Sequence, residues 1–556
     1  MPAIGEIGLY DFLFGRSWAS TATPPSYGIL PFILTSVYGT LGAIIIGVPL
    51  GLMCAIFVAK MAKDCGVTLA DFVANADVRS RVNLKAYITD TVGMPTLTDI
   101  MDALNKRGLD PREQASEFAF DGDKTVFCSY TRSNKNKTFE QQYFQSFEQP
   151  YIIEKMSQMG QNRLMFLPVL VDLGDKKVCI TETDLTSYPG MYLHSKGEGK
   201  LNAHYAPVPD KIKQGGHNML QGLVKSRKPY IAELNGARTF PWRICNIARN
   251  DFELLDNDMV FRLSHPNVIG DTSWIKPGKV AWDWWNNWGL YGLDFKPGIN
   301  NRTYEYYIDF AAANGIEYVI LDEGWSVNLK ADLMQVVPEI DLKHLIDYGK
   351  ERGVGIVLWG GYWAVDRDMD NVFKYYADMG VKGFKIDFMD RDDQDMVNFY
   401  ERAAATAAKY KLMCDFHGAY KPCGLSRKYP NVVNYEGVNG LEQMKWSGLE
   451  LDQVTYDVQI PFIRMVAGPM DYTQGAMLNG TKTTYRESYH EPMSQGTRCR
   501  QLAMYVIFES PFNMLCDSPC NYEKEPVCTE FIADIPTVWD ETRFIEGYPG
   551  KYAVLA

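Results

Sequence analysis

A short apolar run followed by a helical pattern recurs along the second half of the chain, and this recurrence constrains the fold more than any other feature. Such runs stand at intervals of roughly 20 to 40 residues, and most end in Asp, Glu, His or Trp; they are residues 279–283, 318–322, 355–359, 383–387, 412–417 and 432–436. Two further candidates are 461–465 and 511–516. Strands that alternate with helices predict a parallel (β/α)8 TIM barrel, of the α/β class, over residues 271–530.

The fourth run ends in a carboxylate, Asp387, ahead of a helical pattern that begins near Gln394. Barrels of this class place their chemistry in the loops at the carboxyl ends of the strands. Glu436 and Glu442 follow the sixth run, so they and Asp387 are expected at one mouth. Glycoside hydrolysis needs two carboxyl groups, one that protonates the leaving oxygen and one that attacks or activates water. The alternative for Asp387 is a cap on the next helix.

Tryptophans gather after the first three runs. Their aromatic faces suit the apolar faces of sugar rings, and packing of the barrel is the alternative use. These residues are Trp282, Trp284, Trp285, Trp288, Trp325, Trp359 and Trp363.

Length and charge narrow the possibilities. A chain of 556 residues is too long for one compact core. The net charge of −12 argues against a surface that coats nucleic acid, and it is compatible with a neutral substrate or a cation site. The 11 cysteines are scattered without a CxxC pair, which favours reduced thiols over a disulfide framework or a zinc site.

The amino-terminal region has a different character. Gly28 to Ala59 carries no charge and exceeds the roughly 20 residues that cross a bilayer, so it predicts a transmembrane helix and a membrane-associated protein. A buried hairpin is the alternative. Residues 1–62 resemble the first part of a phosphate ABC-transporter permease. Residues 63–123 are charged and helical in pattern, and they are similar to a helical segment of the Tex transcription accessory protein. No basic aromatic platform accompanies them, so no nucleic-acid partner is expected.

From Lys124 the pattern is that of β-structure. Residues 124–270 are expected to form an antiparallel β-sandwich, incomplete because residues 1–123 do not supply the missing strands. Residues 531–556 are expected to begin a further β domain that the chain truncates.

Residues from about 124 onward closely resemble glycoside hydrolase family 97. The motifs that carry the resemblance are residues 180–185, Tyr188 to Met191, Trp282 to Asn286, Leu321 to Trp325, Lys385 to Asp390, Phe416 to Gly418 and Asn434 to Glu442. The resemblance implies an amino-terminal sandwich, a central catalytic barrel and a small carboxyl-terminal β domain.

The same resemblance implies a mechanism, because the family has two branches. Inverting α-glucosidase members carry Glu after the histidine of the fifth strand, where this chain has Gly418. Retaining α-galactosidase members carry an Asp nucleophile at the fourth strand, which Asp387 matches. Glu442 then becomes the general acid/base, and a carboxylate separation of about 5 to 5.5 Å is expected.

The resemblance also implies a calcium ion, held by Glu182, Glu436 and Glu442. Hard oxygen ligands suit calcium. Taken without the resemblance, Glu182 is more typical of a solvated loop residue. The candidate residues for binding an oligosaccharide or glycoside are Lys385, His417, Asp322 and Trp284.

Three alternative functions remain open from the sequence. An α-glucosidase of the same family is one. A membrane transport component rests only on residues 28–59, and an inactive fusion rests on three resemblances that each start or stop within a domain. Oligomeric state and compartment are not determined, although family members are typically secreted or periplasmic.

Overall fold

The computed structural model describes residues 18–19, 26–27, 117–131, 138–236 and 238–556. The chain divides into two compact units, Met1–Asp110 and Pro111–Ala556. In the first unit the described residues form the antiparallel pair β1 (Trp18–Ala19) and β2 (Ser26–Tyr27). No helix within the described ranges is long and apolar enough to cross a membrane. The predicted span, residues 28–59, lies outside those ranges.

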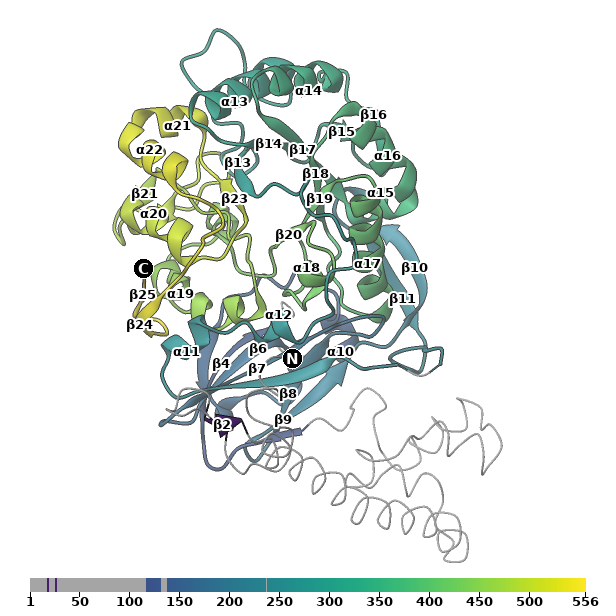
Figure 1. Cartoon of the computed structure of the whole chain (residues 1–556), viewed down its shortest axis with the longest axis vertical. Helices are drawn as coiled ribbons and strands as arrows, with labels where there is room; N and C mark the ends of the chain where they lie inside the picture. The colour runs from purple at the N-terminus through teal and green to yellow at the C-terminus, as the bar shows by residue number, and fades with distance from the viewer. Residues whose placement is uncertain (1–17, 20–25, 28–116, 132–137, 237) are drawn as a thin grey trace, which may run out of the picture. The chain divides into compact units, whose positions relative to one another are not determined.

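The second unit begins with an antiparallel sheet at the base of Figure 1. Its strands are β3 (Glu117–Ala119), β4 (Thr125–Tyr130), β5 (Ile152–Lys155), β6 (Met165–Asp172), β7 (Lys177–Thr183), β8 (Met191–Gly197), β9 (Lys200–Tyr205) and β12 (Trp242–Ala248). Short helices accompany them: α10 (Phe139–Gln142), η3 (Met156–Gln158), α11 (Phe252–Leu255) and α12 (Met259–Arg262).

Strand β6 organises this sheet, because three strands pair with it. β4 runs along one edge, while β7 pairs with one end of the other edge and β8 with the opposite end. Through these pairings all eight strands are connected into one antiparallel sheet, and the expected incomplete sandwich stays a prediction. Strand β3 corrects a prediction, since it lies in the range expected to be helical. Pairing with β9 satisfies its backbone, so tertiary context overrides the local pattern.

A separate hairpin follows, made of β10 (Pro209–Gly215) and β11 (Gln221–Arg227) with η4 (His217–Met219) at its tip. It packs against the barrel, where the Leu220 carbonyl accepts a hydrogen bond from the Trp363 N–H. This hairpin lies beside α15 and α17 in Figure 1.

A parallel sheet of seven strands forms the predicted α/β barrel, in the order β20-β19-β18-β17-β14-β13-β23. The strands are β13 (Gly278–Trp282), β14 (Tyr318–Leu321), β17 (Gly355–Gly361), β18 (Gly383–Asp387), β19 (Met413–Phe416), β20 (Val432–Tyr435) and β23 (Phe512–Leu515). The helices that cover it include α13 (Asn301–Ala313), α14 (Leu342–Glu351), α15 (Tyr362–Arg367), α16 (Met369–Met379), α17 (Gln394–Lys409) and α18 (Leu425–Lys428). β15 (Ser326–Val327) and β16 (Asp332–Val336) form a small antiparallel pair between β14 and α14.

The prediction of a strand at 461–465 was wrong. These residues form η6 (Ile460–Phe462) and η7 (Arg464–Ala467), which curl around the buried Arg464 guanidinium. That guanidinium donates to the carbonyls of Gly437 and Glu436. Residues 470–474 occupy the gap between β20 and β23 instead. The Asp471 N–H donates to Tyr435 O at 2.7 Å, and the Cys516 N–H donates to Gln474 O at 3.2 Å.

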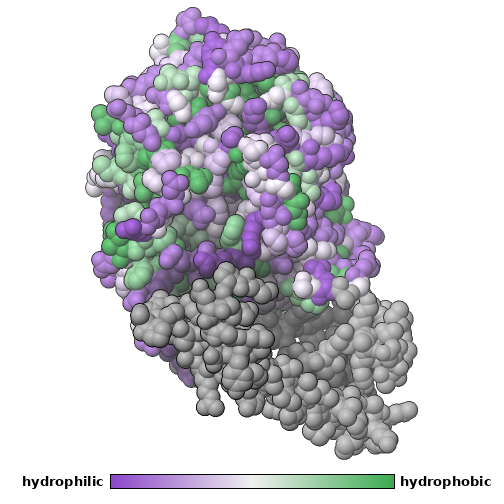
Figure 2. Space-filling view, in the orientation of Figure 1, coloured by the Kyte–Doolittle hydropathy of each residue, from purple (hydrophilic) through white to green (hydrophobic). Residues whose placement is uncertain are grey.

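The remaining elements surround this closure. They are η5 (Leu441–Lys445), α19 (Gln453–Asp457), the parallel pair β21 (Asn479–Gly480) and β22 (Ser494–Gln495), α20 (Arg498–Ile507), α21 (Pro519–Lys524), α22 (Pro526–Asp534), and the hairpin of β24 (Phe544–Tyr548) and β25 (Tyr552–Leu555). Apolar surface is visible at the left of Figure 2. Exposed large apolar side chains of the carboxyl-terminal elements include Val527, Phe531, Trp539 and Ile545.

Candidate active site

Asp387 is the last residue of β18 and the only one of its five that is not fully buried. Two donors fix its carboxylate. The Trp359 indole N–H donates to Oδ2 at 3.1 Å, and the Phe388 N–H donates to Oδ1 at 2.6 Å. Trp359 comes from the neighbouring strand β17, so the sheet register places both groups at one end of the barrel. The side chain is therefore held in one orientation at the mouth.

Glu442 lies in η5, the short helix after β20, and it is also partly exposed. Burial raises the pKa of its carboxyl group, the Lys385 ammonium lowers it, and the negative charge of Asp387 raises it again. The two carboxyl groups therefore act on each other electrostatically, and the structure brings them into one site. A group with a raised pKa is suited to carry a proton that it can donate. Their separation of about 5 to 5.5 Å stays a prediction.

Lys385 lies two residues before Asp387 on the same face of β18. Its ammonium donates to Asp322 Oδ2 at 2.8 Å and lies 4.4 Å from the centre of the Trp282 ring. Burial alone would lower the pKa of Lys385, but the carboxylates of Asp322, Asp387 and Glu442 raise it. The amine therefore stays charged, and it balances part of the negative charge at the mouth.

Asp322 and Trp284 stand around this lysine. The Trp282 indole N–H donates to Asp322 Oδ2 at 2.7 Å, and the Glu323 N–H donates to Oδ1 at 2.7 Å. Trp284 stacks on Trp282 with ring centroids 5.8 Å apart. Three of the four predicted sugar-binding residues therefore lie in one cluster: Lys385 contacts Asp322 directly, and Trp284 is joined to both through Trp282.

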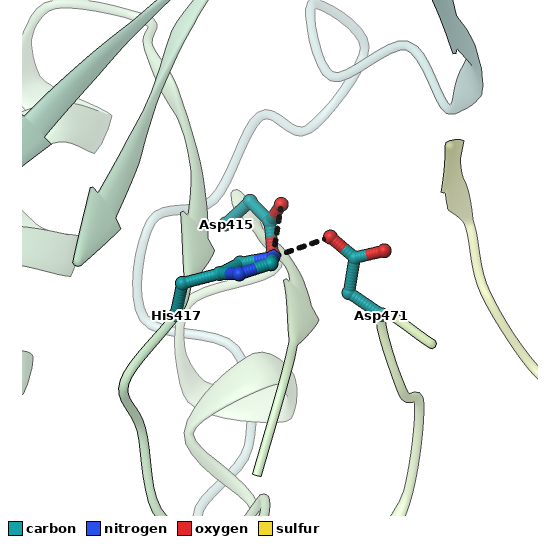
Figure 3. A group of neighbouring side chains, drawn as sticks. All are labelled: Asp415, His417 and Asp471. Carbon is teal, nitrogen blue, oxygen red and sulfur yellow. Dashed lines mark hydrogen bonds and ion pairs between the residues drawn. The ribbon is translucent and has the colours of Figure 1, made fainter. Parts of the chain in front are cut away.

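His417 lies deeper. Its Nε2 is 2.7 Å from Asp471 Oδ2 and 3.7 Å from Asp415 Oδ2, as Figure 3 shows. Its Nδ1 is 3.4 Å from Glu436 Oε2. The ring is 1% exposed, and burial together with the Lys385 charge lowers its pKa to about 4. The neutral imidazole lies among carboxyl groups and can orient Glu436. The predicted role of His417 in binding the sugar stays a prediction.

Burial and mutual repulsion raise the pKa values of the carboxyl groups around His417. Burial raises the pKa of Asp471 to about 6, and burial followed by the Asp471 charge raises the pKa of Asp415. Burial also raises the pKa of Glu436, followed by the charges of Glu148, Glu442 and Asp387. Within the described residues no hydrogen-bond partner reaches the buried Glu436 Oε1. Such a set of oxygen atoms is suited to a hard cation.

Glu182 lies in a different environment from the one predicted for a metal ligand. One oxygen accepts from the Lys421 ammonium, the other is 2.8 Å from Arg243 Nη1, and the Met191 N–H donates to the carboxylate at 3.0 Å. Glu182 is absent from the groups of His, Cys, Asp and Glu side chains whose ligand atoms lie within 4.8 Å of one another in the described ranges. One such group contains His417, Glu436 and Glu442. The two cations already neutralise Glu182.

Several residues at the site were not found from the sequence. Asp415 lies two positions before His417 on β19, so the alternation of a strand could have placed both on one face. Asp471 belongs to the irregular segment that closes the barrel, and Glu148 to a loop of the amino-terminal region. Glu148 accepts from the Gln443 side chain at 2.7 Å beside Glu442. No pattern in the sequence marks either position.

Two acidic side chains at the carboxyl end of a parallel barrel, with a lysine and tryptophans beside them, define a class of enzyme: a glycosidase. Comparison with known proteins gives the family. Residues 284–438 match the model of glycoside hydrolase 97, and residues 103–266 match that of the glycosyl-hydrolase 97 N-terminal domain.

The retaining alpha-galactosidase of Bacteroides thetaiotaomicron is 60% identical over 445 residues, which are 80% of this chain and 67% of that protein. The chain thus spans about two thirds of the length of that relative. A family 97 enzyme from Pseudoalteromonas sp. strain K8, solved as a variant in complex with panose, has a TM-score of 0.66 at 26% identity; the match covers 80% of this chain and 67% of that one. The chain belongs to glycoside hydrolase family 97.

The amino-terminal region has different relatives. Residues 56–112 match the model of an HHH domain. A probable ABC transporter permease protein of Bacillus subtilis, YqgH, is 39% identical over 105 residues, which are 19% of this chain and 33% of that protein. The HHH match lies within residues 1–123, the range expected to have other relatives than the hydrolase. The match to the glycosyl-hydrolase 97 N-terminal model begins at residue 103, ahead of the expected boundary at residue 124.

Proposed function

We propose that this protein hydrolyses terminal α-galactosides with retention of anomeric configuration, with Asp387 as nucleophile and Glu442 as general acid/base. One observation carries the proposal: a carboxylate stands at the end of β18, held by Trp359 and Phe388, and it influences the pKa of a second, partly exposed carboxyl group. The similarity to the retaining alpha-galactosidase supports the substrate.

In the first step Asp387 attacks the anomeric carbon, and the bond from that carbon to the leaving oxygen breaks. Glu442 gives its proton to this oxygen, so the aglycone leaves as a neutral alcohol and a β-galactosyl ester of Asp387 remains. The hydrogen bonds from Trp359 and Phe388 limit the orientations of the carboxylate, which reduces the entropy lost on reaching the transition state.

In the second step the Glu442 carboxylate takes a proton from water, and the oxygen of this water attacks the anomeric carbon. The ester bond breaks, Asp387 recovers its negative charge, and α-galactose leaves. Each step inverts the anomeric carbon once, so the product has the configuration of the substrate.

Gly418 supports retention over the α-glucosidase alternative. A β-carbon at this position would lie 2.9 Å from Asp387 Oδ1 and 2.7 Å from the Phe388 nitrogen. The glutamate that inverting members carry there would therefore displace the Asp387 carboxylate. The space around Gly418 therefore supports the retaining branch over the inverting one.

We also propose a calcium ion near Glu436 and Glu442, with Glu148 as a further ligand. The unpartnered oxygen of Glu436 and the mutual repulsion of these carboxyl groups fit a divalent cation with oxygen ligands. A bound calcium ion would supply positive charge that lowers the pKa values of the carboxyl groups around it. Glu182 is left out of this set because Lys421 and Arg243 already pair with it.

The nucleophile is tested with two variants and one added nucleophile. Asp387→Asn is expected to lower kcat on p-nitrophenyl α-galactoside by about 10³-fold or more. With azide, Glu442→Ala should form α-galactosyl azide and Asp387→Ala should form β-galactosyl azide, because azide attacks the ester intermediate in one case and the substrate in the other. NMR distinguishes the two products. Release of β-galactose by the wild type, or faster hydrolysis of p-nitrophenyl α-glucoside, would refute the proposal.

A further inference from the structure

Two exposed aromatic side chains stand beside the candidate general acid. Trp446 is 45% exposed and Tyr489 is 48% exposed. Both contact the half-buried Trp284 edge-to-face, with ring centroids 6.2 Å and 6.1 Å apart. Trp284 in turn stacks on Trp282. The three outer rings of Trp284, Trp446 and Tyr489 are called the aromatic platform below.

The platform is held in place by its neighbours. The Lys445 ammonium lies 4.3 Å from the ring centres of both Trp284 and Tyr489. It also donates to the carbonyls of Trp284 and Trp285 at 2.9 Å and 2.8 Å. The Trp446 indole N–H donates to Gln443 Oε1 at 3.0 Å. Exposed rings that are fixed in this way lose little conformational entropy when a ligand binds.

The platform lies on the leaving-group side of the reaction centre. Glu442 and Lys445 belong to the same short helix, η5, and Trp446 directly follows it. Burial raises the pKa of the Tyr489 hydroxyl, and the charges of Glu323, Asp322 and Glu442 raise this pKa further, so the ring lies near these carboxyl groups. A general acid must contact the oxygen that it protonates, and that oxygen belongs to the leaving group. The group attached to it therefore lies next to the side chains around Glu442.

We infer that the aromatic platform is the binding site for the leaving group and that it takes a sugar ring. A pyranose has an apolar face of C–H groups that stacks on aromatic rings. This inference rests on the proposed function. It implies that the preferred substrates are oligosaccharides in which galactose is α-linked to another sugar.

The test compares two substrates that differ only in the leaving group. α-Galactosyl fluoride has no leaving sugar, whereas a disaccharide of galactose α-linked to glucose presents one to the platform. Trp446→Ala and Tyr489→Ala are each expected to lower kcat/KM on the disaccharide about fivefold to tenfold, the size of one aromatic contact. On the fluoride kcat/KM should stay within about twofold of the wild type. Trp446→Phe should restore most of the activity on the disaccharide.

A matched control is Tyr375→Ala, since Tyr375 is 46% exposed on α16, away from Glu442. This variant should have the wild-type kcat/KM on both substrates. An equal loss on both substrates in the platform variants, or no loss on the disaccharide, would overturn the inference. A wild type that hydrolyses neither substrate would refute the proposed function alone. In that event the inference is tested by calorimetric titration with the disaccharide. A larger dissociation constant for Trp446→Ala than for the wild type would support the inference, and equal dissociation constants would overturn it.

Discussion

Gly418 shows how one residue determines which carboxylate can act in this barrel. Its φ of +52° lies in the left-handed region, and a β-carbon would press on Asp387 Oδ1 and on the Phe388 backbone. The residue after His417 and the residue at the end of β18 therefore compete for the same space. With Asp387 as the proposed nucleophile, a glycine at 418 leaves the space that its carboxylate occupies.

We predict that Gly418→Ala lowers kcat about 10²-fold or more, because the added methyl group shifts the nucleophile by a few tenths of an ångström or more. KM should change less, since the sugar-binding residues are untouched. Steady-state kinetics on p-nitrophenyl α-galactoside checks this. Gly315→Ala is the matched control: its φ of +64° carries the same backbone strain, but nothing lies within 4 Å of the added carbon. A similar loss of activity in both variants would assign the effect to strain alone.

The hairpin of β10 and β11 is the element that supports the loop after Asp387. The His217 ring packs on Phe388 with centroids 4.7 Å apart, and Phe388 has the left-handed φ of +64° that is costly for a bulky residue. Further along, Gln221 donates to Asp390, and Arg227 Nη1 is 3.1 Å from Asp393 Oδ2. The hairpin thus contacts this loop at three successive points.

We predict that His217→Ala lowers kcat about tenfold or less and leaves KM nearly unchanged. Without the ring, Phe388 loses a packing partner, and its N–H no longer holds Asp387 Oδ1 as firmly. Lys213→Ala, an exposed position on the same hairpin, should have wild-type kinetics. If His217→Ala raised KM tenfold at constant kcat, His217 would be a substrate ligand and the positioning role would be wrong.

The attachment of the hairpin tip should depend on pH. His217 Nε2 is 2.9 Å from Glu323 Oε2, and this hydrogen bond raises the pKa of His217 against the opposing effect of burial. The pKa of this histidine is higher in the folded state than in the unfolded state, where it is about 6.5. The protonated ring therefore stabilises the folded protein fully below about pH 6.5, and this stabilisation is lost as the pH rises through the folded-state pKa. The ring is half exposed, so the gain is below about 1 kcal/mol. The Tm difference between wild type and Glu323→Gln should therefore be larger at pH 5.5 than at pH 9; the reverse order would contradict the pairing.

The elements differ in how far the sequence could predict them. Runs of β-forming residues that alternate with helical patterns predicted seven barrel strands and the start of α17 almost to the residue. The segment 461–465 failed because a buried arginine, invisible to local periodicity, decides its conformation. Asp471 and Glu148 were missed for a related reason, since only the closed barrel brings irregular segments to Glu436. The expectation for Glu182 did not anticipate Lys421, which lies 239 positions away in sequence.

At the scale of the whole molecule, buried polar contacts join the amino-terminal sheet to the barrel. Glu182 on β7 pairs with Lys421, which follows β19. Tyr192 on β8 donates to Asp392 Oδ1 at 2.8 Å, and the Asn439 side chain donates to the Glu148 carbonyl at 3.0 Å. Because these groups are buried on both sides, separating the sheet from the barrel would leave several charges without partners. The sheet and the barrel should therefore unfold together in one transition.

We predict that Glu182→Gln lowers the free energy of unfolding by about 3 to 5 kcal/mol, because it leaves Lys421 and Arg243 buried without a counter-charge. Denaturant unfolding, followed with and without calcium, checks this. We expect calcium to raise the stability of the wild type. This increase should persist in Glu182→Gln and vanish in Glu436→Gln, since of these two glutamates Glu436 is the one with an oxygen that no hydrogen bond reaches. If Glu182→Gln instead lost the calcium effect while its stability without calcium stayed at the wild-type level, Glu182 would be a metal ligand after all, and Lys421 would have to release it when the ion binds.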